Sequence, residues 1–196
     1  ESTYLEVSYL LYHGELPTSD QLDDFRSKVK DNMTLEKSVK KLLLTFPENA
    51  HPMSMLMTSV ASLSSIYHHE INIKEPEDRE AFFFQVLGKM PMLAATIFNH
   101  INKKTVGSYN EQLNYSANIL NLFFGGNANY ERSPVFSKAL DVLLILHADH
   151  EQNCSTSSVR LTGSSGTNPY AAMSAGVAAL WGPLHGGANE AVVRMF

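Results

Sequence analysis

The chain has 196 residues, 44% hydrophobic and 18% charged, so it is long enough to bury one sizeable core. With only 11 glycines and 8 prolines, its composition excludes a fibrous or disordered protein. Its 20 acidic and 15 basic side chains give a net charge of -5, and no run of Lys or Arg exceeds two residues. This pattern lacks the electrostatic footprint of a nucleic-acid-binding protein.

Three features predict a cytoplasmic protein without a membrane partner. The single cysteine, Cys154, has no second cysteine to pair with, which favours a reducing compartment. The residues from Tyr4 to Leu11 follow an amphipathic helical pattern and lack the basic-then-apolar layout of a signal peptide. The run from Val142 to Leu146 is far shorter than the roughly 20 apolar residues of a membrane span. Because helical patterns also reach both ends of the sequence, we expect a fragment of a longer protein.

The first half of the chain predicts three helices after the turn at Gly14 to Pro17. Thr18 and Gln21 have the spacing of a capping box, so a helix is expected to start there, with Leu22, Phe25 and Val29 on one face. Thr34 is expected to cap the next helix, which ends before Pro47. Pro52 suits a first helical position, and the expected buried stripe of this third helix is Met53, Met57, Val60, Leu63 and Tyr67.

The second half predicts four further helical stretches. One runs from Pro76 to about Lys103 and is expected to bend or split at Pro91. Another covers about 111–124, with Gly125 and Gly126 at its end and Leu113, Ala117, Leu120 and Phe124 on one face. Ser133 and Pro134 open a helix that extends through Leu146, and an Ala- and Gly-rich helix from Pro169 to Trp181 allows close helix packing.

No segment alternates apolar and polar residues for long enough to predict a strand. No internal repeat, low-complexity tract or linker marks a domain boundary. We therefore predict an all-α fold of eight or more helices.

The first candidate site is the polar segment from His147 to Asn153, which directly follows the apolar run from Val142 to Leu146. That run is expected in the interior, so the segment would deliver imidazoles and carboxylates to a cleft. A solvated helix end explains the same residues equally well, because His favours the negative end of a helix dipole. A metal site built on His147, Asp149 and His150 is the sharper alternative. The HExxH spacing and a cysteine pair are both absent, which disfavours it.

The second candidate site is the turn from Gly182 to Glu190, where His185 stands between one helix and the next. Unpaired N–H groups at a helix start disfavour imidazolium, so His185 is expected to be neutral and able to donate a hydrogen bond. A neutral imidazole can stabilise an enolate oxygen, a role that the same device performs in triosephosphate isomerase. A structural turn in which His185 only packs is the alternative.

These segments together resemble citrate synthase of the bacterial type. The similarity lies in the residues from Leu144 to Asn153, from Ser155 to Arg160 and from Gly182 to Glu190, with weaker pieces at Tyr9 to Thr18 and His51 to Met53. It covers essentially the whole chain. The resemblance implies an almost wholly helical fold, and this chain would be the central portion of the large domain (1–196), ending near the start of the small domain.

The resemblance also implies a reaction and two site residues. Citrate synthases condense acetyl-CoA with oxaloacetate and hydrolyse the citryl thioester to citrate and CoA. By motif match, His185 is the catalytic residue that donates a hydrogen bond to the thioester oxygen, and His150 lines the oxaloacetate site. The family's second catalytic histidine and its general-base aspartate lie beyond the matched motifs, so we expect this chain alone to be inactive.

Partners follow from the same resemblance. The expected ligands are acetyl-CoA, as a substrate, and oxaloacetate, with no cofactor and no metal. The expected assembly is a homodimer or hexamer. Two alternatives remain at this stage: 2-methylcitrate synthase, which uses propionyl-CoA and shares both histidine motifs, and a noncatalytic helical or metal-binding domain.

Overall fold

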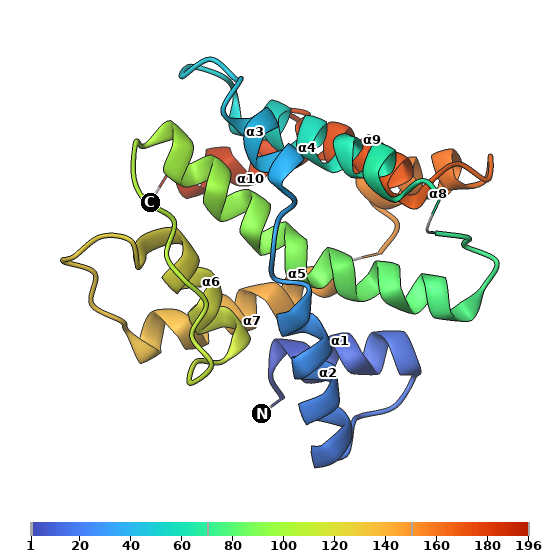
Figure 1. The fold of residues 1–196 in the computed structure, drawn as a ribbon, viewed down its shortest axis with the longest axis horizontal. Helices are drawn as coiled ribbons and strands as arrows, with labels where there is room; N and C mark the ends of the chain where they lie inside the picture. The colour runs from blue at the N-terminus through green and yellow to red at the C-terminus, as the bar shows by residue number, and fades with distance from the viewer. Residues whose placement is uncertain (1, 70, 150, 196) are drawn as a thin grey trace. The chain divides into compact units, whose positions relative to one another are not determined.

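The computed structural model describes residues 2–69, 71–149 and 151–195, and these form ten α-helices and no strand (Figure 1). The all-α prediction is confirmed. In chain order the helices are α1 (Tyr4–His13), α2 (Ser19–Asp31), α3 (Lys37–Leu43), α4 (Pro52–Tyr67), α5 (Pro76–Ile101), α6 (Tyr115–Phe124), α7 (Pro134–Ala148), α8 (Cys154–Gly163), α9 (Pro169–Leu180) and α10 (Gly186–Val193).

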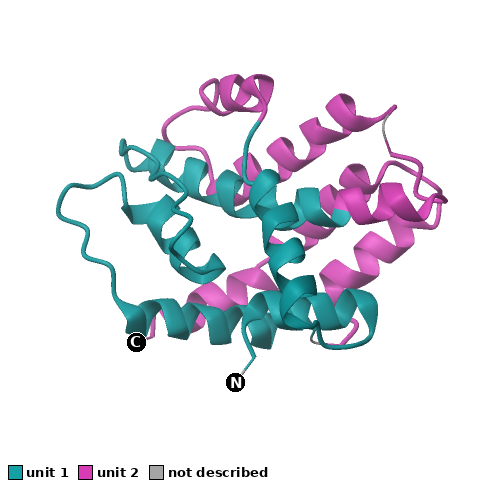
Figure 2. Ribbon diagram, turned by 60° about the horizontal axis from the view of Figure 1, so that its bottom comes forward, with its two compact units in different colours: residues 1–35, 83–150 teal, residues 36–82, 151–196 magenta. Residues whose placement is uncertain are grey.

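The chain divides into two compact units, each built from two separate segments (Figure 2). Unit 1 contains Glu1–Leu35 and Phe83–His150, and unit 2 contains Glu36–Phe82 and Glu151–Phe196. Helix α5 belongs to both, because the division falls after Phe82. Each unit is described by itself below.

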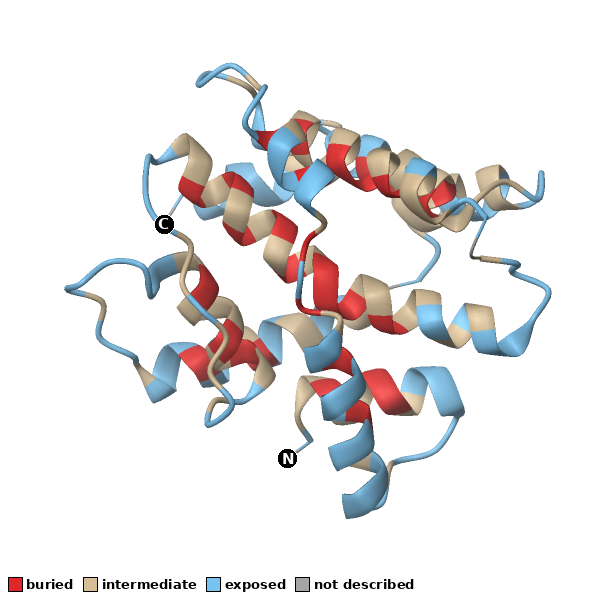
Figure 3. Ribbon diagram, in the orientation of Figure 1, coloured by how far each residue is buried: buried red, intermediate tan, exposed pale blue. Residues whose placement is uncertain are grey.

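Unit 1 has two clusters of buried apolar side chains. The larger cluster joins α1, α2 and α5, whereas the smaller one includes the end of α5 and α6; Figure 3 marks buried positions on these helices in red. The buried members of the larger cluster are Leu5, Tyr9, Phe25, Val29, Phe84 and Leu87. Those of the smaller cluster are Met33, Ala95 and Leu122.

Unit 2 is organised around α9, which packs against both α8 and α4. The expected close approach is confirmed at Gly176, where an added Cβ would lie 2.6 Å from Val159 Cγ2 on α8. On the α4 side, the Ser174 hydroxyl donates to the Met57 carbonyl at 3.1 Å. The small residues of α9 therefore let two neighbouring helices approach it closely.

Three of the predicted helix starts are confirmed. Thr18 caps α2, and its backbone N–H donates to the Gln21 side chain at 2.8 Å, as a capping box requires. Ser133 caps α7 with Pro134 at its first position, and Pro52 opens α4. Each cap lies within three residues of its partner, so the sequence contains the whole interaction.

Three boundaries differ from the prediction. The N-cap of α3 is Glu36 rather than Thr34. Helix α6 begins at Tyr115 because the Asn114 side chain accepts from the Ala117 N–H at 2.8 Å and ends the preceding turn. Pro91 lies inside α5 without splitting it.

The predicted buried faces are only partly correct, with Val60 and Leu63 on α4 buried as expected. On α4 the fully buried methionine is Met55, which lies between the predicted Met53 and Met57. On α6 the buried residues are Ser116, Asn118 and Leu122, whereas Phe124 is 39% exposed. The pattern failed because polar residues with specific hydrogen-bond partners occupy the inner face of α6.

The apolar run on α7 is not interior, contrary to the sequence prediction. Val142, Leu143 and Leu146 are 41%, 51% and 61% exposed. The buried face of α7 instead carries Asp141, whose Oδ1 accepts from the Ser116 hydroxyl at 2.6 Å. A continuous apolar run surrounds a helix, so a helix that buries one polar face leaves part of the run outside.

Among the described residues, α5 is long and apolar enough, by length and composition only, to cross a membrane. The expectation of no membrane span rested on the shorter run from Val142 to Leu146. Leu93 and Ala95 in α5 are fully buried within the fold, and a core helix passes the same test.

Candidate active site

The candidate site in unit 2 begins where α8 starts. The Asn153 side chain accepts from the Thr156 N–H at 3.0 Å and so fixes the first turn of this helix. Ser155 lies in that turn and is half-buried. Its side chain therefore projects from the positive end of the α8 dipole.

The turn between α9 and α10 is held by its own backbone. The N–H groups of His185 and Gly187 both donate to the Gly182 carbonyl, at 3.0 and 3.1 Å. An added Cβ on Gly186 would lie 2.2 Å from the Leu180 carbonyl oxygen, so only glycine fits there. At Gly186 the close neighbour is therefore the preceding helix, α9.

His185 occupies the N-cap position of α10, as predicted, and is half-buried. Its side chain contacts α8, because the Ser155 Oγ lies 2.9 Å from the His185 Nε2. Thirty residues separate this pair in the chain. Ser155 is the site residue to which sequence reasoning assigned no role, since no local spacing links it to the turn.

A second histidine supports the same turn. His51 caps α4, with its Nδ1 accepting from the Met53 N–H at 3.2 Å. Its ring stacks on Trp181, the C-cap of α9, at a centroid distance of 4.9 Å. Trp181 immediately precedes Gly182, so this stack anchors the residue from which the turn departs.

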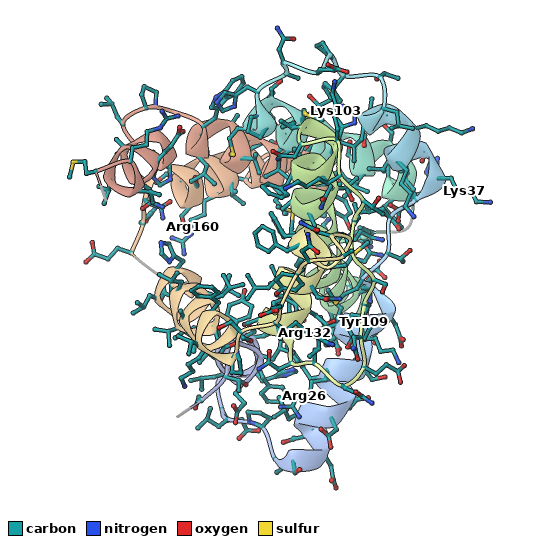
Figure 4. All side chains as sticks on the ribbon, turned by 90° about the vertical axis from the view of Figure 1, so that its left-hand side faces the viewer. Arg26, Lys37, Lys103, Tyr109, Arg132 and Arg160 are labelled. Atoms are coloured by element: carbon teal, nitrogen blue, oxygen red, sulfur yellow. The ribbon has the colours of Figure 1, made fainter. Side chains whose placement is uncertain are left out.

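Two arginines of unit 2 lie near the C-terminal ends of α8 and α10. Arg160 is exposed on α8 and donates to the neutral Gln152 side chain at 3.4 Å, so that contact leaves its charge uncompensated (Figure 4). Arg194 instead forms an ion pair with Glu190 at 2.6 Å on α10. Arg160 is therefore the better candidate for an anionic substrate group.

Tyr170 on α9 is excluded as an acid or base near neutral pH. Burial raises the pKa of its hydroxyl far above the ordinary value, and Tyr67 and Glu36 raise it further. Its ring is 1% exposed and stacks with Tyr67 at 5.7 Å. It serves the packing of α9.

His147, in the first candidate segment, has different surroundings from His185. His147 is exposed at the end of α7 in unit 1, and its Nδ1 lies 2.7 Å from the Leu143 carbonyl of the same helix. His150 lies outside the described residues. Within the described part of the chain, no group of three His, Cys, Asp or Glu side chains is placed to hold a metal ion.

Comparison with known proteins assigns the chain to a family. Residues 1–196 match the family model described as citrate synthase, C-terminal domain. The chain belongs to the citrate synthase family. The resemblance seen in the sequence is thus confirmed at the level of the family.

Solved citrate synthases share this fold. The enzyme from Pyrobaculum aerophilum is 33% identical over 98% of this chain, with a TM-score of 0.86. The enzyme from Thermotoga maritima is 27% identical over the whole chain, with a TM-score of 0.83. The Thermoplasma acidophilum enzyme, solved with carboxymethyl coenzyme A and oxaloacetate, is 27% identical over 97% of this chain, with a TM-score of 0.86. The chain spans about half the length of each of them, 49%, 49% and 48% in the same order.

Proposed function

We propose that the whole protein containing this chain condenses acetyl-CoA with oxaloacetate and hydrolyses the product to citrate and CoA. Family membership supports this reaction, and a citrate synthase from the same family has been solved with oxaloacetate and a coenzyme A analogue. In this proposal His185 is the catalytic hydrogen-bond donor. The observation that carries the assignment is the contact between Ser155 Oγ and His185 Nε2 at 2.9 Å.

That contact selects one ring nitrogen for the substrate. A serine hydroxyl can donate to Nε2, and a neutral imidazole then carries its proton on Nδ1. With Nε2 engaged by Ser155, Nδ1 of His185 is the nitrogen available to donate to the thioester oxygen of acetyl-CoA. A donor held in place before the reaction stabilises negative charge without reorganisation.

The proposed sequence of steps uses that donor first. A carboxylate supplied by another part of the whole protein removes a methyl proton of acetyl-CoA, and the electron pair moves to the thioester oxygen, which accepts from Nδ1 of His185. The resulting enolate carbon attacks the ketone carbon of oxaloacetate and forms the new carbon–carbon bond, while the C=O π electrons move to the ketone oxygen, which takes up a proton from an acid in another part of the whole protein. Water then cleaves the citryl thioester, which releases citrate and CoA.

Oxaloacetate needs cationic or hydrogen-bonding partners for its two carboxylates. We assign one such contact to His150 by motif match. Arg160 is a further candidate because its contact with Gln152 leaves its charge uncompensated. His150→Ala in the whole protein is then expected to raise the KM for oxaloacetate more than the KM for acetyl-CoA.

The remaining features of the parent protein follow from the family resemblance. We propose that this chain is the central portion of the large domain of a bacterial-type enzyme, which is cytoplasmic, works as a homodimer or hexamer and needs no cofactor. The 196-residue chain alone is expected to form no citrate above background. Citrate formation by the purified chain would contradict this.

Substrate preference separates the proposal from its nearest rival. The test is the ratio of kcat/KM for acetyl-CoA to that for propionyl-CoA, measured on the whole protein with oxaloacetate. A ratio well above one supports citrate synthase. A ratio below one identifies a 2-methylcitrate synthase, and no turnover of either overturns the proposal.

A further inference from the structure

The turn that carries His185 is attached to the end of α9 at two residues. The Trp181 N–H donates to the Val177 carbonyl at 3.1 Å, and the Gly182 N–H donates to the Ala179 carbonyl at 3.1 Å. The Gly182 carbonyl in turn accepts from the His185 N–H at 3.0 Å. A displacement of Trp181 would therefore pass through Gly182 to the backbone of His185.

Trp181 lies outside the buried core and is held from α4. It is 40% exposed, and its ring stacks on the His51 ring with centroids 4.9 Å apart and an interplanar angle of 30°. The His51 ring is itself fixed at the start of α4, because its Nδ1 accepts from the Met53 N–H at 3.2 Å. The His51 carbonyl accepts from the N–H of the fully buried Met55. The stack thus connects the end of α9 to a well-anchored helix start.

Other contacts already join the two helices of this stack. Helices α4 and α9 lie side by side within unit 2 (Figure 1). The Ser174 hydroxyl donates to the Met57 carbonyl about two helical turns before the end of α9. Near the other end of α9, the Tyr170 ring stacks on Tyr67 at 5.7 Å. Since these contacts hold the body of α9, the additional stack acts on the end of the helix, where the turn departs.

We propose that His51 and Trp181 are positioning residues for the turn that carries His185, an inference that rests on the proposed function. They act through Gly182 on the His185 ring. A hydrogen-bond donor stabilises developing charge best when it is in place before the reaction, and a misplacement of about 1 Å can lower the rate strongly. Loss of the stack is therefore expected to lower kcat while the KM for oxaloacetate stays near its original value.

The test is a double-mutant cycle in the whole protein, with citrate formation as the readout. Trp181→Leu removes the indole, and His51→Asn removes the imidazole but keeps a side-chain acceptor at the start of α4. Each should lower kcat about three- to tenfold and change the KM for oxaloacetate less than about twofold. The double variant should be no slower than either single variant, because both remove the same contact. Losses that multiply in the double variant would overturn the proposal.

A second stack between the same two helices supplies the matched control. Tyr67→Leu removes the ring that stacks on Tyr170, near the opposite end of α9, and should change kcat less than about twofold. Trp181→Phe keeps an aromatic ring and should recover most of the kcat that Trp181→Leu loses. If Tyr67→Leu loses as much kcat as Trp181→Leu, or if Trp181→Phe recovers none, the proposal is wrong.

A readout that needs no turnover separates this proposal from the proposed function. Nitrogen-15 NMR of the histidine-labelled whole protein reports on the His185 ring directly. Its resonances should move in Trp181→Leu and in His51→Asn and stay in place in Tyr67→Leu. Unmoved His185 resonances in the first two variants overturn the positioning role, whether or not the protein forms citrate. Moved resonances in a protein that forms no citrate contradict the proposed function and support the link between the stack and His185.

Discussion

The end of α7 in unit 1 and the turn before α10 in unit 2 each present a histidine at a helix end, yet the two histidines have different surroundings. His147 is exposed and contacts only its own helix among the described contacts, through the Leu143 carbonyl. His185 is half-buried and contacts Ser155 on another helix. A catalytic imidazole needs a fixed tautomer and orientation, and a partner from a second element provides both. The difference favours His185 as the catalytic residue.

Replacing each histidine by alanine in the whole protein should give the largest contrast in activity between the two sites. His185→Ala is expected to lower kcat about 10²- to 10³-fold, because it removes a donor aimed at the developing negative charge. His147→Ala should change kcat less than about twofold, since it removes an exposed contact within one helix. Steady-state citrate formation with both substrates saturating measures both. Equal losses would mean that the local contacts do not distinguish the two residues.

Ser155→Ala removes the hydrogen-bond partner of His185 and leaves the imidazole ring in place. Loss of one hydrogen bond to Nε2 should lower kcat about two- to tenfold while the KM for oxaloacetate stays near its original value. Ser158→Ala is the matched control on the same helix, because the Ser158 hydroxyl donates only to the Cys154 carbonyl one turn earlier among the described contacts. Should the control lose as much activity, the effect belongs to α8 as a whole.

Gly186→Ala tests whether backbone packing holds the turn. The new Cβ would meet the Leu180 carbonyl oxygen, so the variant should lose about 1–3 kcal/mol of unfolding free energy. Gly163→Ala is the control, since nothing lies within 4 Å of its added Cβ and α8 ends there. Denaturant unfolding of the whole protein measures both, and unchanged stability of Gly186→Ala would show that the turn can move aside.

Glu6 gives the smallest expected effect, and it lies in unit 1. The Thr3 N–H and then the Thr3 hydroxyl hold the pKa of the Glu6 carboxyl below its ordinary value. A lowered folded pKa contributes stability that is present above the ordinary pKa and lost as pH falls through the folded value. Because Glu6 is half-buried and its carboxyl remains in contact with solvent, the contribution should be below about 1 kcal/mol. Glu6→Gln should make the unfolding free energy less dependent on pH, measured by denaturant unfolding between about pH 5 and about pH 2.

The sequence predicted the parts of the fold that depend on near neighbours. Thr18 with Gln21, Ser133 with Pro134 and Gly125 after α6 act within one helical turn, and all three mark helix ends in the structure. The family resemblance was recognisable for a similar reason, because its motifs are continuous stretches of chain.

Residues whose roles depend on distant partners could not be predicted in this way. Asp141 is buried on α7 because Ser116 on α6 and the Tyr4 N–H of α1 donate to it, and neither is near in sequence. The exposure of Val142, Leu143 and Leu146 is the consequence. Ser155 was overlooked for the same reason, since its partner is thirty residues away.

The central claim is that Ser155 fixes the His185 ring so that Nδ1 carries the proton offered to substrate. Nitrogen-15 NMR of the whole protein, labelled in histidine and recorded with the His185 ring neutral, reports which nitrogen is protonated. The account predicts a protonated Nδ1 and an unprotonated Nε2, with this preference weakened in Ser155→Ala. A proton on Nε2 in the unsubstituted protein would contradict it.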